Sequence, residues 1–220
     1  MKINAIVTGT TGMVGEGVLH ECLAHPNVER ILLLSRRPTG VRNPKVQELL
    51  HADFLNLTPA EAQLAGYNAC LFCLGISSLG VAPPEYERMT YDLTLHVAQT
   101  LARLNPDMTF CYVSGAGTDS TEQGRSRWAR VKGRTENALL KLPFRHAYMF
   151  RPGFLKPTAG LRRTGRLYTY LGWLYPVLQR FFPATASTLQ ELGQAMINAV
   201  LVGYPKPVLE VSDIVALAHK

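Results

Sequence analysis

The chain has 220 residues, of which 47% are hydrophobic and 18% are charged, and its formal net charge is +7. This apolar content is enough for one sizeable core, which excludes an intrinsically disordered protein. The positive charge suits an anionic ligand, whereas no zinc-ligand spacing, zipper pattern or aromatic-studded basic strand is found, so nucleic-acid binding is not expected.

The first segment, MKINAIVTG, enters a strand at once and lacks the apolar region and cleavage site of a secretory signal peptide. Four cysteines, Cys22, Cys70, Cys73 and Cys111, do not make a disulfide framework in a chain of this length. The lack of a signal peptide predicts a cytoplasmic protein.

Short apolar runs alternate with segments of helical period. The runs are INAIV (3–7), RILLL (30–34), a shorter one in VQELLHAD (46–53), NACLFCL (68–74), MTFCYV (108–113) and RHAYMF (145–150). Helices are expected over Val14 to Leu23, Tyr86 to Leu104 and Trp128 to Leu142. This alternation predicts an α/β fold with a doubly wound parallel sheet, the Rossmann fold, in the strand order 3-2-1-4-5-6.

The first strand leads directly into TGTTGMVGEGVL, in which Gly9, Gly12 and Gly15 have the spacing G-x-x-G-x-x-G. Glycines between a strand and a helix let the backbone turn tightly and approach a pyrophosphate, which the free N–H groups of the helix then bind. The candidate cofactor-binding residues of this loop are Gly9, Thr11, Gly12, Met13, Val14 and Gly15.

The second strand ends in Ser35, Arg36 and Arg37, where an NAD-specific Rossmann fold usually carries an acidic residue. Hydrogen-bond donors and positive charge suit a 2′-phosphate, so NADP is expected as the cofactor in preference to NAD. The residues after the third and fourth strands complete the predicted site: Asp53, Phe54, Leu74, Gly75 and Ile76.

The fourth predicted strand contains a Cys-x-x-Cys pair, Cys70 and Cys73. Side chains alternate along a strand, so the two thiols are expected on opposite faces, which favours core packing over metal or redox chemistry.

We expect residues 1–150 to form the NADP-binding core and residues 151–220 to form a small C-terminal helical cap with closing elements of the same compact domain. The segment STLQELGQAMINAVLVG (187–203) predicts a helix with Ser187 or Thr188 as its N-cap. The aromatic segment 167–182 is shorter than the ~20 apolar residues that span a bilayer and contains Pro176, so we expect it in the cap, ahead of a homodimer contact or a membrane surface.

Seven short motifs carry a resemblance to a known family: TGTTGMVG, SRRP, HADF, CLG, YVSGAG, WARVKG and RPG. With these, the chain resembles an atypical, extended-like short-chain dehydrogenase/reductase, similar to the sugar-epimerase-like proteins and the small Tat-interacting oxidoreductase group. The resemblance implies a nicotinamide dinucleotide, contacts from Pro152 and Gly153 of RPG, and a small carbonyl or sugar substrate. It also implies a catalytic serine, tyrosine and lysine, of which Ser114 and Lys132 match while Trp128 occupies the position of the tyrosine. In the family this lysine also binds the nicotinamide ribose, so Lys132 is expected to bind the cofactor as well.

The tryptophan leaves catalysis open, because an indole N–H donates a hydrogen bond but is no general acid–base at neutral pH. We favour a sensor or regulatory protein that binds NADP with weak or no turnover. One alternative is an active enzyme with another acid, for which Tyr91, Tyr112, His96 and His146 are the candidates. Others are hydride delivery to an already acidic substrate, or a wrong alignment of this helix. A serine hydrolase is not expected, since no G-x-S-x-G occurs.

Overall fold

The computed structural model describes residues 1–162 and 185–220. The main sheet consists of β1 (Ile3–Thr8), β2 (Val28–Ser35), β3 (Val46–Leu50), β4 (Ala69–Phe72), β5 (Thr109–Val113), β6 (His146–Phe150) and β9 (Val208–Leu209), and β7 (Phe154–Lys156) pairs with β8 (Ala186–Thr188). The helices are α1 (Met13–Ala24), α2 (Glu61–Leu64) after the 3-10 turn η1 (Thr58–Ala60), α3 (Pro83–Glu87), α4 (Leu93–Leu104) after the π-helical turn η2 (Arg88–Asp92), α5 (Arg127–Leu139), α8 (Leu189–Val202) and α9 (Val211–Ala218).

The main sheet is parallel throughout and has the order β3-β2-β1-β4-β5-β6-β9. The expected doubly wound sheet and its order are confirmed. The structure adds a seventh strand, β9, which pairs with the end of β6 through Met149 and Phe150. Its two residues are too few to show a strand pattern in the sequence.

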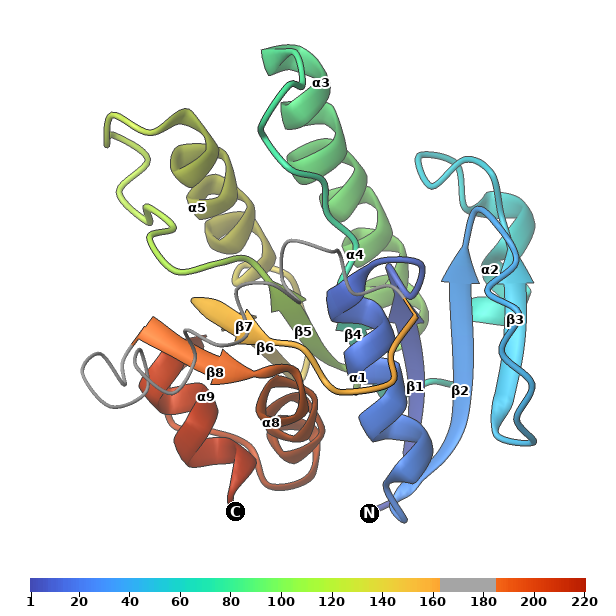
Figure 1. The fold of residues 1–220 in the computed structure, drawn as a ribbon. Helices are drawn as coiled ribbons and strands as arrows, with labels where there is room; N and C mark the ends of the chain where they lie inside the picture. Colours follow the sequence, from blue (N-terminus) through green and yellow to red (C-terminus); the bar gives the residue numbers. More distant parts are fainter. Residues whose placement is uncertain (163–184) are drawn as a thin grey trace.

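Helices cover both faces of the sheet (Figure 1). Because side chains alternate along a strand, Ala5 and Val7 of β1 pack with α1, α8 and α9, while Ile6 packs in a second core with α4. The two thiols of the Cys-x-x-Cys pair follow the same rule, since Cys70 lies in the α4 core and Cys73 packs against the α1 core. The cysteines are therefore on opposite faces, as expected.

A capping box starts α8. The Thr188 hydroxyl accepts a hydrogen bond from the Glu191 backbone N–H at 3.0 Å, and the Glu191 carboxylate accepts one from the Thr188 N–H at 2.7 Å. Thr188, the last residue of β8, is thus the N-cap, and Ser187 is not. The helix packs on α1, which places residues after 185 in the same layer as the glycine loop's helix.

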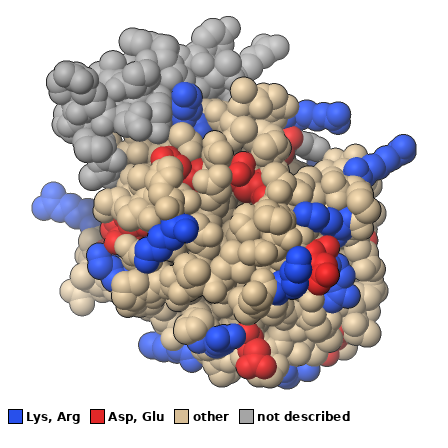
Figure 2. Space-filling view, turned by 90° about the horizontal axis from the view of Figure 1, so that it is seen from below, with Lys and Arg blue, Asp and Glu red and all other residues tan. Residues whose placement is uncertain are grey.

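The expectations for the aromatic segment 167–182 fall on residues outside the described part of the chain. In the described part, every helix is too short or too polar to cross a bilayer. Lys and Arg side chains are scattered over the face that carries the N-terminal ends of the strands, and in this view they do not gather into one patch (Figure 2).

Candidate functional site

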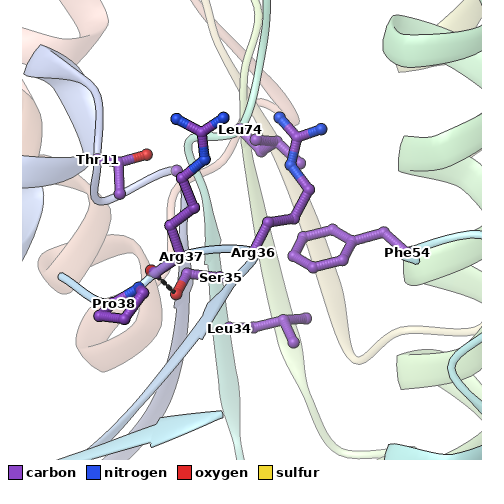
Figure 3. Close-up of a pocket in the computed structure, with 9 residues that line it drawn as sticks. Thr11, Leu34, Ser35, Arg36, Arg37, Pro38, Phe54 and Leu74 are labelled. Carbon is purple, nitrogen blue, oxygen red and sulfur yellow. Dashed lines mark hydrogen bonds between the residues drawn. The ribbon is translucent and has the colours of Figure 1, made fainter. Parts of the chain in front are cut away.

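A cavity of about 330 Å³ opens where the parallel strands end. The loops after β1, β2, β3 and β4 all reach it, because the carboxyl ends of parallel strands meet at one edge of the sheet. Its lining residues are Gly9, Thr11, Leu34, Ser35, Arg36, Arg37, Pro38, Phe54 and Leu74 (Figure 3).

The glycine loop brings three backbone segments into contact. Gly9 has a φ of +71°, and a Cβ there would lie 2.5 Å from the Cys73 carbonyl oxygen. A Cβ on Gly15, inside α1, would overlap the Gly9 carbonyl oxygen. Gly12 donates its N–H to the Gly9 carbonyl at 2.9 Å and begins α1 without a side-chain cap. The loop therefore has the tight turn and the open helix N-terminus that suit an anionic group.

Met13 and Val14 form the first turn of α1, and their side chains pack partly against the core on that face. These two residues accordingly offer backbone N–H groups to a ligand, while their side chains serve packing.

Two guanidinium groups extend from the end of β2 toward the cavity. In Figure 3, that of Arg37 lies on the side of Thr11 and that of Arg36 on the side of Phe54. Both arginines are exposed. The Ser35 hydroxyl donates to the Arg37 carbonyl at 2.8 Å, so it shapes this turn.

Of the other residues predicted to bind the cofactor, some line the cavity and others do not. Phe54 is buried in its wall, and Leu74 lines it while donating its N–H to the Thr8 hydroxyl at 3.2 Å. Asp53 lies outside the lining, with its carboxylate accepting from the Leu55 N–H at 2.9 Å. Gly75 and Ile76 follow Leu74 and do not line the cavity either.

Trp128 and Lys132 lie one turn apart near the start of α5. The Lys132 ammonium donates to the Ser114 backbone carbonyl at 2.5 Å. Trp128 is half-buried, and its ring lies beside Gly117, where a Cβ would come within 3.7 Å of Cη2. Burial lowers the pKa of Lys132 to about 8, against the opposing effect of the Glu136 carboxylate.

The Ser114 hydroxyl points away from Lys132. It lies 2.5 Å from Glu136 Oε1 and 3.0 Å from the Phe150 carbonyl oxygen, in the protein interior. The structure therefore brings Lys132 to Ser114 at the backbone but turns the side chain that the resemblance makes catalytic toward Glu136. Sequence reasoning missed Glu136, although it stands four residues after Lys132 and so shares its helix face.

The RPG segment contributes structure at the ends of β5 and β6. Pro152 accepts a hydrogen bond at its carbonyl from the Ala116 N–H at 2.8 Å, and a Cβ on Gly153 would overlap the Thr185 carbonyl oxygen. Neither residue lines the cavity. Arg151, which precedes them and was not predicted, binds the Glu136 carboxylate through Nε at 3.1 and 3.2 Å and also through Nη2.

Gly133 lets α5 approach the loop after β5. A Cβ there would overlap the Asp119 carbonyl oxygen, and the Asp119 N–H donates to the Ala129 carbonyl at 3.1 Å. This contact sets how far Lys132 stands from Ser114.

The four alternative acids lie in different environments. Tyr112 is 2% exposed, and burial raises its pKa far above the ordinary value. His146 is the first residue of β6, so it lies at the end of the strand away from the cavity, where it stacks on Tyr148. Both are thus poor candidates. Tyr91 lies under the Arg134 guanidinium, 4.0 Å from ring centroid to Cζ, and His96 is half-buried on α4.

No family model matches the chain. Among curated proteins it is 27% identical to Leucinostatins biosynthesis cluster protein T of Purpureocillium lilacinum, over 90% of this chain and 85% of the relative. It is also 27% identical to the protein named fmp52, mitochondrial, of Emericella nidulans, over 90% of this chain and 87% of the relative.

Two solved structures show the same fold. One is the Bordetella bronchiseptica enzyme WbmF in complex with NAD+, with a TM-score of 0.67, 15% identity and coverage of 99% of this chain and 77% of that chain. The other is a short chain dehydrogenase family protein of Francisella tularensis, with a TM-score of 0.65, 12% identity and coverage of 92% and 93%. The expected resemblance to short-chain dehydrogenase/reductases is confirmed at the level of the fold.

The prediction of a cytoplasmic protein is contradicted, because curated relatives such as the Emericella nidulans protein are named mitochondrial. The prediction rested on the lack of a secretory signal. That observation concerns the secretory route and does not distinguish the cytoplasm from the mitochondrion.

Proposed function

We propose that the chain binds a nicotinamide dinucleotide in the cavity after β1 and β2, prefers NADP(H) to NAD(H), and acts as a sensor or regulatory protein with weak or no turnover. The observation that carries this proposal is the pair Arg36 and Arg37 on the same cavity as the glycine loop. A phosphate on the adenosine ribose would find two guanidinium groups there.

The residues present fit such a cofactor. The close approach of Gly9 and Gly15 leaves backbone at the N-terminus of α1 free of side chains, which suits the pyrophosphate. Phe54 and Leu74 give the cavity an apolar wall for a base, and no acidic residue is among its described lining residues. The comparison structures of this fold include complexes with NAD, so the preference for NADP(H) rests on this chain's own arginines.

The bound cofactor would supply a hydride. Lys132 would bind the hydroxyls of the nicotinamide ribose. The Trp128 indole would stack against the bound ligand or donate one hydrogen bond to it. The phenol is replaced by the indole, and the Ser114 hydroxyl is held by Glu136. The phenol of the family's catalytic set is thus absent and its serine hydroxyl is turned toward Glu136, which supports binding without rapid turnover.

A second candidate is an active NADP-dependent oxidoreductase or epimerase-like enzyme that acts on a small carbonyl or sugar compound with a different acid. One observation favours it: burial lowers the pKa of Lys132 to about 8, so this ammonium can release a proton near neutral pH. Of the four candidate acids expected from the sequence, Tyr91 and His96 remain for this role.

Calorimetric titration with NADPH, NADP+, NADH and NAD+ tests the proposal, followed by an absorbance assay of NADPH consumption with a panel of aldehydes, ketones and nucleotide sugars. We expect the two phosphorylated forms to bind at least ~10-fold more tightly, with little oxidation of NADPH. Equal affinities for NADPH and NADH would refute the cofactor preference, and rapid NADPH oxidation would refute the sensor role.

A further inference from the structure

Glu136 is a carboxylate completely buried in the protein interior, with 0% of its surface exposed. It lies on α5, one turn beyond Lys132. A buried charge is costly unless it is paired and hydrogen-bonded, and an apolar residue could fill the same space. The contacts of Glu136 are therefore informative about its role.

The carboxylate joins α5 to the ends of two strands. It accepts hydrogen bonds from the Ser114 hydroxyl after β5 and from the Arg151 guanidinium after β6. Arg151 continues the network to Glu210, at 3.0 Å, and to the Ser120 hydroxyl, at 2.5 Å. Loops that follow β5 and β6 are thus tied to one helix through a single buried group.

Glu136 and Lys132 hold the same residue from two sides. Glu136 binds the Ser114 hydroxyl, and Lys132 binds the Ser114 carbonyl. Residues four apart on a helix share a face, so the carboxylate also acts on the ammonium directly. Its charge raises the pKa of Lys132, while burial lowers it.

We propose that Glu136 is a positioning residue for Lys132. Glu136 holds the Ser114 backbone in place and keeps the Lys132 ammonium charged where the nicotinamide ribose would bind. This inference rests on the proposed function. It assigns Ser114 a structural part: its hydroxyl anchors the loop to Glu136, and its carbonyl orients Lys132.

The charged and titratable groups around Glu136 come from every element that packs on it. They are Lys132 on α5, Tyr112 on β5, Arg151 after β6 and, beyond that arginine, Glu210 at the N-cap of α9. Arg151 stays charged at all accessible pH values and Tyr112 stays neutral, because burial raises its pKa. Lys132 is accordingly the group whose titration reports on a change at Glu136.

The first experiment follows the titration of Lys132 in Glu136→Gln by NMR of carbon-13-methylated lysines, with Lys132→Arg to assign the signal. The amide keeps the shape of the side chain and removes its charge. We expect the proton-binding constant of Lys132 to fall about tenfold, since a neighbouring opposite charge shifts a pKa by roughly one to three units. The matched control is Glu87→Gln, which removes an exposed carboxylate of α3 that pairs with Arg134 of α5. It should leave the titration of Lys132 unchanged.

The second experiment measures NADPH affinity of the wild type and Glu136→Gln from pH 6 to pH 9. Near pH 6 Lys132 is charged in both proteins, so we expect nearly equal affinities. Above pH 8 the ratio of dissociation constants should approach about tenfold, because the variant loses its ammonium charge earlier. A ratio that does not change with pH would overturn the electrostatic part of the inference.

If the Glu136→Gln variant does not fold, the Glu136→Asp variant tests the positioning role in its place. It retains the charge and shortens the side chain by one methylene, so the bonds to Ser114 and Arg151 cannot both form. We expect NADPH to bind about threefold more weakly even at pH 6, as for a lost hydrogen bond.

The two proposals fail separately. An unchanged Lys132 titration in Glu136→Gln, or unchanged NADPH binding in Glu136→Asp, would overturn the positioning role and leave cofactor binding intact. A wild-type protein that binds no nicotinamide dinucleotide would overturn the proposed function, whatever the titration of Lys132.

Discussion

The Lys132 ammonium meets Ser114 at its backbone carbonyl, 2.5 Å away, and not at its hydroxyl. The hydroxyl lies on the opposite side of the residue, against Glu136. The lysine therefore has a fixed place at the end of β5 that does not depend on a catalytic serine. This geometry supports the proposal that Lys132 holds a ribose without catalytic turnover.

Replacing both Arg36 and Arg37 by alanine should remove most of the preference for NADPH over NADH. Each guanidinium reaches the cavity, and together they give the charge that a 2′-phosphate needs. We expect NADPH to lose at least ~10-fold in affinity, about 1.4 kcal/mol, with little change for NADH. Calorimetry measures both, and Arg103→Ala with Arg145→Ala is the control, since it removes the same charge at exposed positions outside the cavity. An equal loss for both cofactors would contradict the assignment.

Lys132→Ala should weaken NADPH binding by ~1.5–3 kcal/mol at pH 7, the range for a hydrogen bond from a charged donor. Trp128→Ala should weaken it less, because the indole offers only stacking and one neutral donor. The comparison needs only binding titrations. If the tryptophan variant lost more affinity than the lysine variant, the indole would be the main contact.

Trp128→Tyr places a phenol four residues before Lys132 on the same face of α5. We expect it to create NADPH-dependent reduction of a reactive carbonyl compound that the wild type does not reduce. The gain should stay modest, since the Ser114 hydroxyl still points to Glu136. Trp128→Phe is the control, as it changes the ring without adding an acid, and equal activity in both variants would argue against a proton-donor role for this position.

The lowered pKa of Lys132 in the folded protein should make the free energy of unfolding depend on pH. Its pKa is about 8 in the folded protein, below the ordinary 10.5, so the unfolded chain binds more protons between these values. Through this group, the free energy of unfolding should rise as the pH rises from 8 to 10.5, and the cost of the buried charge is fully present below pH 8. Urea unfolding of wild type and Lys132→Met at pH 7.5 and pH 10 isolates the effect, at pH values chosen to bracket this range. A difference between the two proteins that is the same at both pH values would show an unperturbed lysine.

Gly133→Ala should destabilise the fold by ~1–3 kcal/mol, the usual cost of overpacking. The added methyl group would overlap the Asp119 carbonyl oxygen, a backbone atom that cannot move without shifting the loop after β5. Gly75→Ala is the matched control, because a Cβ there meets nothing within 4 Å. Denaturant unfolding should separate the two variants, and equal midpoints would show that α5 can retreat from the loop.

Local patterns in the sequence determined the sheet and the cofactor cavity. Apolar strands separated by helical segments leave a parallel sheet as the way to bury both faces, and right-handed crossovers then give the order from β3 to β6. The glycine loop and Arg36 follow strand ends directly, so their common edge could be inferred from chain order alone. Such features depend on residues that are close in sequence.

Only the tertiary structure decided what Ser114 does. Its hydroxyl could turn toward Lys132 or toward the interior, and it lies in the interior because Glu136 and the Phe150 carbonyl accept hydrogen bonds there. That choice depends on Arg151, which follows β6 and neutralises the Glu136 carboxylate. The partners are far apart in sequence, so the direction of a side chain with two possible acceptors follows from packing and buried charge, which no local motif records.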